Sequence, residues 1–125
     1  MGQYVEYNKM IDEIISLLSL IEKILMKLKR NFSMLPYEEK VKIINSCFLG
    51  ITIIKFILRS ISERNLKDVV LPLTTRLELA NQKVVEACKK ENPEQLEIIL
   101  NTEILPAFIE WKSELEKTFS PYISS

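Results

Sequence analysis

The sequence contains no histidine at all. This absence excludes histidine as a catalytic acid or base, Ser–His and Cys–His nucleophiles, and every metal site that uses an imidazole ligand. Glycine is almost as scarce, because only Gly2 and Gly50 are present. A phosphate-binding loop of the Rossmann or P-loop type needs several glycines at fixed offsets, so both are excluded. The same scarcity disfavours an all-β fold with many tight turns.

Cysteine is also rare, with Cys47 and Cys88 far apart inside apolar segments. We interpret both as small buried side chains, and a disulfide or a two-cysteine metal site is the minor alternative because neither has a second ligand nearby. Reduced thiols fit a cytoplasmic protein. The sequence therefore predicts a cytoplasmic location, no metal and no cofactor.

Positive and negative charges are balanced, because Lys and Arg together number 17 and Asp and Glu together also number 17. This balance argues against a nucleic-acid partner and against a polybasic membrane-binding patch. The most apolar run, residues 47–58, is shorter than the roughly 20 residues that span a bilayer, so we expect no membrane partner. With 125 residues, the chain is predicted to be a single helical-bundle domain over 1–125.

What the sequence does contain is apolar residues at spacings of three and four, which predict helices. Four such segments are separated by proline, asparagine or charged clusters. They cover residues 7–30, 36–62, 69–90 and 92–119.

Local signals refine where these helices begin. Pro36 suits the first turn of the second helix, and Asp68 is the preferred N-cap of the third, with Asn65 as the alternative. The fourth has the clearest start, because Asn92 can cap, Pro93 takes the first helical position and Gln95 follows at the third.

Pro106 falls in the middle of the fourth helix and predicts a kink there, because it cannot bond to the Thr102 carbonyl. Short connections place consecutive helices antiparallel. The predicted fold is therefore all-α, an antiparallel up-down-up-down four-helix bundle with helix four kinked at Pro106.

The first two helices carry more apolar surface than the interior of a bundle requires. The second is interpreted either as the most buried helix or as one covered by a second copy of the chain. A tryptophan beside a proline kink belongs to the core or lines a groove, and tryptophan is favoured at interface hot spots. The predicted partner-binding residues are Phe48, Ile53, Phe56, Ile57, Pro106, Phe108 and Trp111.

The run Glu103-Ile104-Leu105-Pro106 followed by Trp111 forms an E-I-x-P-x-x-x-x-W motif. With Leu77-Glu78-x-Ala80 and Glu91-Asn92 upstream, it resembles small all-helical proteins of unknown function from clostridia and related low-GC Firmicutes. That resemblance implies no activity. In size and helix order the chain is also similar to the flagellar export chaperone FliS, which binds a flagellin tail.

These observations favour a non-enzymatic bundle that binds a protein, either as an export-type chaperone or as a homodimeric adaptor. Two alternatives stay open. One is a Mg²⁺-dependent bundle that binds or hydrolyses nucleotides through carboxylates, and the other is a structural homo-oligomer.

Overall fold

A computed structural model describes the backbone of residues 2–61 and 66–123, and the side chains of residues 8–61 and 66–122. The described residues form helices, turns and short loops, and none of them lies in a strand. The α-helices are α1 (Gly2–Asn31), α2 (Tyr37–Leu58), α3 (Leu71–Lys89), α4 (Pro93–Ile99) and α5 (Leu105–Ile123). The prediction of an all-helical protein with four main helical segments is confirmed, because α4 and α5 belong to one rod.

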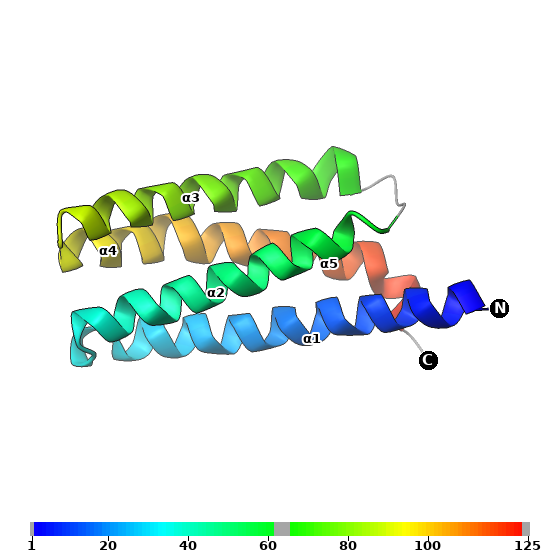
Figure 1. The fold of residues 1–125 in the computed structure, drawn as a ribbon, viewed down its shortest axis with the longest axis horizontal. Coiled ribbons are helices and arrows are strands. Elements are labelled where there is room, and N and C mark those ends of the chain that lie inside the picture. The colour runs from blue at the N-terminus through cyan, green and yellow to red at the C-terminus, as the bar shows by residue number, and fades with distance from the viewer. Residues whose placement is uncertain (1, 62–65, 124–125) are drawn as a thin grey trace.

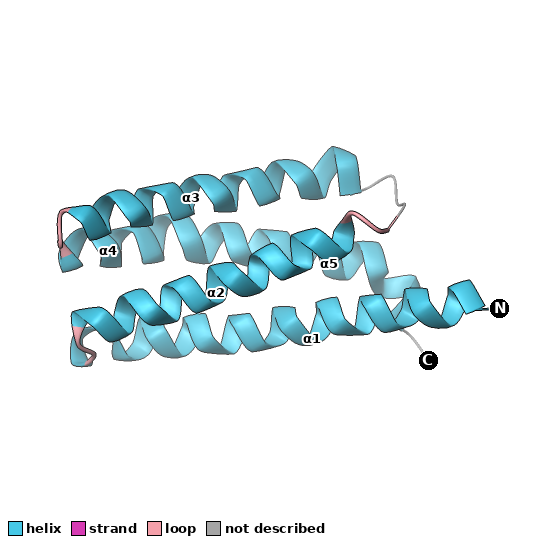
Figure 2. Cartoon of the chain, viewed as in Figure 1, coloured by secondary structure: helices cyan, strands magenta, loops and turns pink. Residues whose placement is uncertain are grey.

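Three shorter helical segments complete the described chain. A 3₁₀ turn, Phe32–Met34, follows α1, and π-helical segments Leu66–Val70 and Leu100–Ile104 precede α3 and α5. Because α4, Leu100–Ile104 and α5 follow one another without a break, they form the single fourth rod (Figure 2).

The rods lie side by side (Figure 1). α1 packs mainly against α2 and α5, and α3 packs against α4 and α5, whereas α2 meets α3 at few positions. The buried apolar side chains form one continuous cluster along the rods. Its largest fully buried members include Trp111, Phe108 and Phe119 of α5. The bundle is therefore tight along the α1–α2 and α3–α5 contacts and more open between α2 and α3.

Gly50 sets how closely α1 and α2 approach. A Cβ atom added at Gly50 would lie 2.9 Å from Cδ1 of Ile21, closer than side-chain carbons normally come. The missing side chain therefore admits Ile21 and fixes the level at which the two helices face each other.

Several predicted boundaries need correction. Pro36 has extended backbone and lies just before α2, and α2 ends at Leu58 rather than at residue 62. Asp68 is not the N-cap of the third rod, because it lies inside the π-helical segment Leu66–Val70. The alternative cap, Asn65, lies outside the described residues. The predicted Asn92 cap is confirmed, since its side-chain oxygen accepts from the Gln95 amide at 3.1 Å.

The chain immediately before Pro106 is π-helical. Residues Leu100–Ile104 are wound more loosely than an α-helix, and the Leu105 amide donates to the Leu100 carbonyl five residues back. The Thr102 hydroxyl donates to the Ile98 carbonyl at 2.7 Å. A π-helical turn carries an extra residue and often marks a bend or a functional position.

α2 is not the fully buried helix that one reading of its sequence predicted. Its inner face is covered, with Ile44 and Ile54 fully buried. Its outer face still carries large apolar side chains in contact with solvent, so the stripe that exceeded the needs of the bundle lies on the surface.

Candidate protein-binding surface

The most exposed apolar residues of α2 form a stripe along its outer face. Leu49, Ile53 and Phe56 are 64%, 44% and 68% exposed. Spacings of four and three residues place them on one side of the helix. We call these three residues the α2 stripe. Single exposed apolar side chains are common on proteins, whereas a contiguous row marks a surface that contacts another molecule.

A shallow groove runs beside the α2 stripe, between α1 and α2. Its volume is about 470 Å³, and its floor is apolar with polar residues at one end. Leu20 of α1 is 53% exposed and lies in this groove together with Ile53. The residues that line it are Lys9, Asp12, Glu13, Ser16, Leu17, Leu20, Ile53 and Ile57. Stripe and groove share Ile53, so they form one surface, which we call the α1–α2 face.

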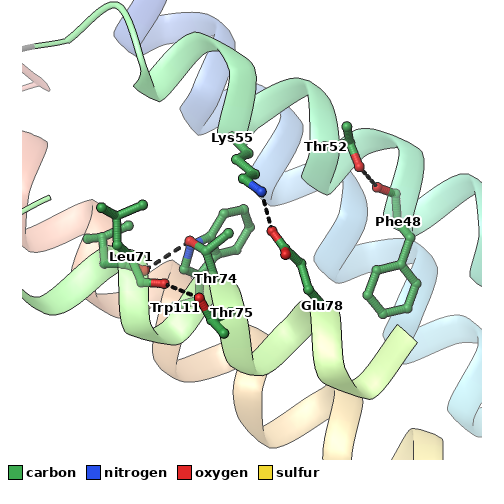
Figure 3. A network of polar contacts seen from close by, with 9 residues as sticks. Phe48, Thr52, Lys55, Leu71, Thr74, Thr75, Glu78 and Trp111 are labelled. Carbon is green, nitrogen blue, oxygen red and sulfur yellow. Dashed lines mark hydrogen bonds and ion pairs between the residues drawn. The ribbon is translucent and has the colours of Figure 1, made fainter. Parts of the chain in front are cut away.

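Charged side chains border the stripe on the side of α3. The Arg59 guanidinium lies 5.5 Å from the centre of the Phe56 ring, a cation–π contact that leaves the ring exposed. Lys55 turns away from the stripe and forms an ion pair with Glu78 of α3 (Figure 3). The charges on α2 nearest to the stripe are therefore engaged within the molecule.

Three of the predicted partner-binding residues are buried. Trp111 and Phe108 have no exposed surface, and their ring centres lie 6.0 Å apart in a tilted arrangement. Phe48 is 7% exposed. Phe48 and Phe108 were predicted at a partner surface and instead lie in the core, because their helices turn them inward. For Trp111 the sequence left core and groove open, and the structure places it in the core.

A buried polar contact fixes the orientation of Trp111. Its indole N–H donates to the Thr74 hydroxyl at 2.9 Å, and that hydroxyl donates to the Val70 carbonyl, also at 2.9 Å (Figure 3). Thr74 is one of few buried polar residues and is 2% exposed. The indole therefore has its required partner inside the core, as buried tryptophan normally does.

The remaining predicted residues divide between two helices. Ile53 and Phe56 are exposed on the α2 stripe, Ile57 is half-buried in the adjacent groove, and Pro106 is exposed on α5. The structure thus brings together the predicted residues of α2 and leaves Pro106 apart from them. Leu49 and Leu20 lie outside the main apolar stripes of their helices, and both are exposed, as expected from the excess apolar surface that the sequence predicts on the first two helices.

A second open surface lies between α3 and α4, where the sequence indicated none. It encloses about 940 Å³ and includes the exposed apolar residues Leu79 and Ile98. An ion pair between Lys83 and Glu103, at 2.8 Å, crosses it and links α3 to the fourth rod. Most of the residues that line this surface are polar or charged, and polar groups make up a larger part of it than of the groove beside the α2 stripe. It is therefore less suited to an apolar partner than the α1–α2 face.

Few side chains in the described part of the chain are suited to catalysis or to binding a metal. Cys47 and Cys88 are free thiols, and burial raises the pKa of Cys47 to about 11. Such a thiol stays protonated at neutral pH and is a poor nucleophile. In residues 8–61 and 66–122, no three Asp, Glu or Cys side chains come close enough together to hold a metal ion.

By length and composition α2 could cross a membrane. It has 22 residues and a mean hydropathy of 1.9 in its most apolar stretch, of which 28% is buried. The 12-residue run identified in the sequence is shorter than this stretch, because Asn45, Ser46 and Lys42 interrupt the apolar residues that precede it. One such helix is weak evidence, since core helices of soluble proteins meet the same criterion.

The chain belongs to the family described as Domain of unknown function (DUF8042), which matches residues 9–114. This agrees with the resemblance of the motif around Pro106 to a family of unknown function. No curated protein and no solved structure matches the chain.

Proposed function

We propose that this member of a family of unknown function is a non-enzymatic helical bundle that acts by binding protein through its α1–α2 face. The observation that carries the proposal is the α2 stripe, where Leu49, Ile53 and Phe56 are each between 44% and 68% exposed. Burying apolar area is the main favourable term in most protein association. An apolar row that the bundle itself leaves uncovered is best explained by a partner that covers it.

The fold suits this role because the face rests on a rigid support. Ile44, Cys47, Ile51 and Ile54 anchor α2 to the core. Gly50 lets α1 lie close beside it. The partner therefore meets a preformed surface and does not have to order it, which favours affinity.

We further propose that the four rods form an antiparallel up-down-up-down bundle whose fourth rod bends at Pro106. The reversal of the chain at each connection supports the first part (Figure 1). The π-helical turn Leu100–Ile104 supports the second, because π-turns and prolines are the two commonest causes of sharp bends.

A protein partner fits the face better than a membrane does. The inner side of α2 is packed against the core, and Ile51 and Ile54 would lose those contacts if the helix entered a bilayer as a separate span. Lys9, Asp12 and Glu13 also border the groove, and charged groups are costly inside a bilayer. We therefore propose a cytoplasmic protein that has neither a membrane nor a nucleic acid as its partner.

The main alternative is a bundle that binds nucleotide and Mg²⁺ through carboxylates. A ligand that binds the folded state raises the thermal midpoint in proportion to the logarithm of its concentration. Thermal unfolding with millimolar Mg²⁺ and with ATP, GTP or dUTP should show no rise. A rise that depends on both metal and nucleotide would establish the alternative.

The binding proposal itself is tested with a hydrophobic dye and one pair of variants. If the α1–α2 face of the wild-type protein is not already covered by a partner, the protein should bind the dye 8-anilinonaphthalene-1-sulfonate. The Phe56→Glu variant should bind less of this dye. The matched control is Ile109→Glu, because Ile109 on α5 is 52% exposed and lies outside the face. Equal dye binding by wild type and both variants, with all three monomeric, would contradict the proposal.

A further inference from the structure

Charged residues flank the apolar centre of the α1–α2 face in a self-complementary order. On α1, Leu17 and Leu20 lie midway between an acidic pair, Asp12 and Glu13, and a basic pair at positions 23 and 27. At 1.5 Å per residue, each pair lies about 9 Å from the midpoint. A two-fold rotation about this midpoint exchanges the two ends, so it would place the acidic pair of one chain opposite the basic pair of another.

These four charges are unpaired within the part of the chain whose side chains the structure describes. Among the residues that the structure describes, none of Asp12, Glu13, Lys23 and Lys27 lies within ion-pair distance of an opposite charge. Other charges on the outer faces do pair, as Lys112 does with Glu22 and Glu116. The four unpaired groups are therefore available for contacts outside the chain.

The α2 stripe has the same centre as the charge pattern on α1. Its midpoint lies between Thr52 and Ile53, and the contact of Gly50 with Ile21 places that level beside Leu17 and Leu20 of α1. The same two-fold rotation would set Leu49 of one chain against Phe56 of the other, a large aliphatic side chain against an aromatic ring.

The other charges of the face tolerate this arrangement. Arg59, at one end of α2, would face Asn45 and Ser46, which are uncharged. Lys42 and Lys9 lie farther from the midpoint than the paired groups, at the rim where charges are well hydrated. Lys9 of each chain would lie close to Lys27 of the other there, and solvent and salt screen this repulsion. No like charges are thus brought together at the centre.

The extent of the face is also sufficient for a dimer. The stretch of α1 from Lys9 to Lys27 is about 27 Å long, and two adjacent helices are roughly 20 Å wide. Together they give a plan area of roughly 500 Å², and the accessible area of a corrugated helical surface is larger. Stable interfaces bury about 800 Å² per partner, which is comparable.

From these observations we propose that a second copy of this chain covers the α1–α2 face, in a two-fold dimer that pairs Asp12 and Glu13 of each chain with Lys23 and Lys27 of the other. This inference rests on the proposed function and names the partner. The two-fold axis makes every contact twice, so a small complementary pattern is doubled in effect.

Charge exchange between two differently substituted chains tests the arrangement directly. One variant carries Asp12→Lys and Glu13→Lys, and the other carries Lys23→Glu and Lys27→Glu. Each alone should place like charges opposite each other, weakening the dimer roughly tenfold or more. Mixed together, they should form a dimer of one chain of each kind, because opposite charges then face each other at both ends.

The readout is the molar mass by light scattering after size exclusion, with native mass spectrometry to identify the mixed dimer. Glu94→Lys with Glu97→Lys makes the same charge change as the first variant on exposed residues of α4, and it should leave the dimer intact. High salt should partly restore the homodimer of each single variant, because it screens the repulsion. Far-UV circular dichroism verifies that every variant is folded.

Different negative results would contradict the two-fold dimer and the protein-binding function on which it rests. A wild-type dimer that neither variant weakens, or variants that do not recover on mixing, would overturn the two-fold arrangement. A wild-type monomer that binds the hydrophobic dye through Phe56 would overturn the second copy as occupant and leave protein binding intact. A monomer that binds no dye would overturn both, as would a monomer that floats with phosphatidylglycerol-containing vesicles.

Discussion

From the contact between Trp111 and Thr74 we predict how much substitution of Trp111 should lower the free energy of unfolding. Trp111 is fully buried and donates to a hydroxyl that is itself engaged with the Val70 carbonyl. A buried tryptophan removes roughly 200 Å² from water, worth about 5 kcal/mol at 25 cal/mol per Å², of which alanine retains a minor part. Adding about 1 kcal/mol for the hydrogen bond, Trp111→Ala should lower the free energy of unfolding by about 3–5 kcal/mol.

Two further variants separate the ring from the hydrogen bond. Trp111→Phe keeps most of the apolar contact and leaves the Thr74 hydroxyl bonded to Val70, so the expected loss is about 1–2 kcal/mol. Thr74→Val leaves the indole N–H buried without an acceptor, which costs about 1–3 kcal/mol. In the double variant the two losses should not add, because both remove the same contact.

The assay is urea unfolding followed by far-UV circular dichroism, since the substitution removes the chain's only tryptophan as a fluorescent probe. All variants must be compared at one protein concentration, because association adds to apparent stability. A loss below about 2 kcal/mol for Trp111→Ala would refute its place in the core. Full additivity of the two single variants would refute the hydrogen bond.

Three other predictions follow from individual contacts. Asn92→Ala removes the cap of α4 and should cost about 1 kcal/mol in the same unfolding assay, whereas Asn92→Asp should cost much less. In the folded protein iodoacetamide should alkylate the half-buried Cys88 before Cys47, which is buried and has a pKa of about 11, and mass spectrometry of the digested protein would detect the reverse order. Burial lowers the pKa of Lys112, but two neighbouring carboxylates more than offset this and raise it above its ordinary 10.5. Its stabilising contribution should therefore be complete below that value and disappear as the pH rises through the higher pKa of the folded state, a dependence that Lys112→Met should remove.

The helical content of the chain was predictable because its signals are local. Apolar spacing identified four rods, and the Asn92-Pro93 sequence located the start of the fourth, since a cap depends only on neighbouring residues. The π-helical segments before Leu71 and Leu105 were not predictable, because they depend on packing between helices. The Asp68 cap failed for that reason.

Which side of each helix faces the core was harder to predict from the sequence. Phe48 and Phe108 were included in the predicted partner surface and are buried, and Trp111, for which core and groove both stayed open, belongs to the core. Ile53 and Phe56 were identified correctly as exposed, because they lie outside the apolar stripe that the core requires. The groove between α1 and α2 depends on the spacing of two helices, which no pattern along one helix reveals.

We propose that a second copy of the chain covers the α1–α2 face in solution, and sedimentation equilibrium of the wild-type protein is the measurement that tests this dimer. From micromolar to several hundred micromolar protein, we expect a single transition from the 14.6 kDa chain to twice that mass. Phe56→Glu should remain at the mass of one chain over the whole range, because it buries a charge at the centre of the interface. A wild-type protein that stays at 14.6 kDa at the highest concentration would contradict a dimer formed through the α1–α2 face. A dimer that Phe56→Glu leaves unchanged would contradict it as well.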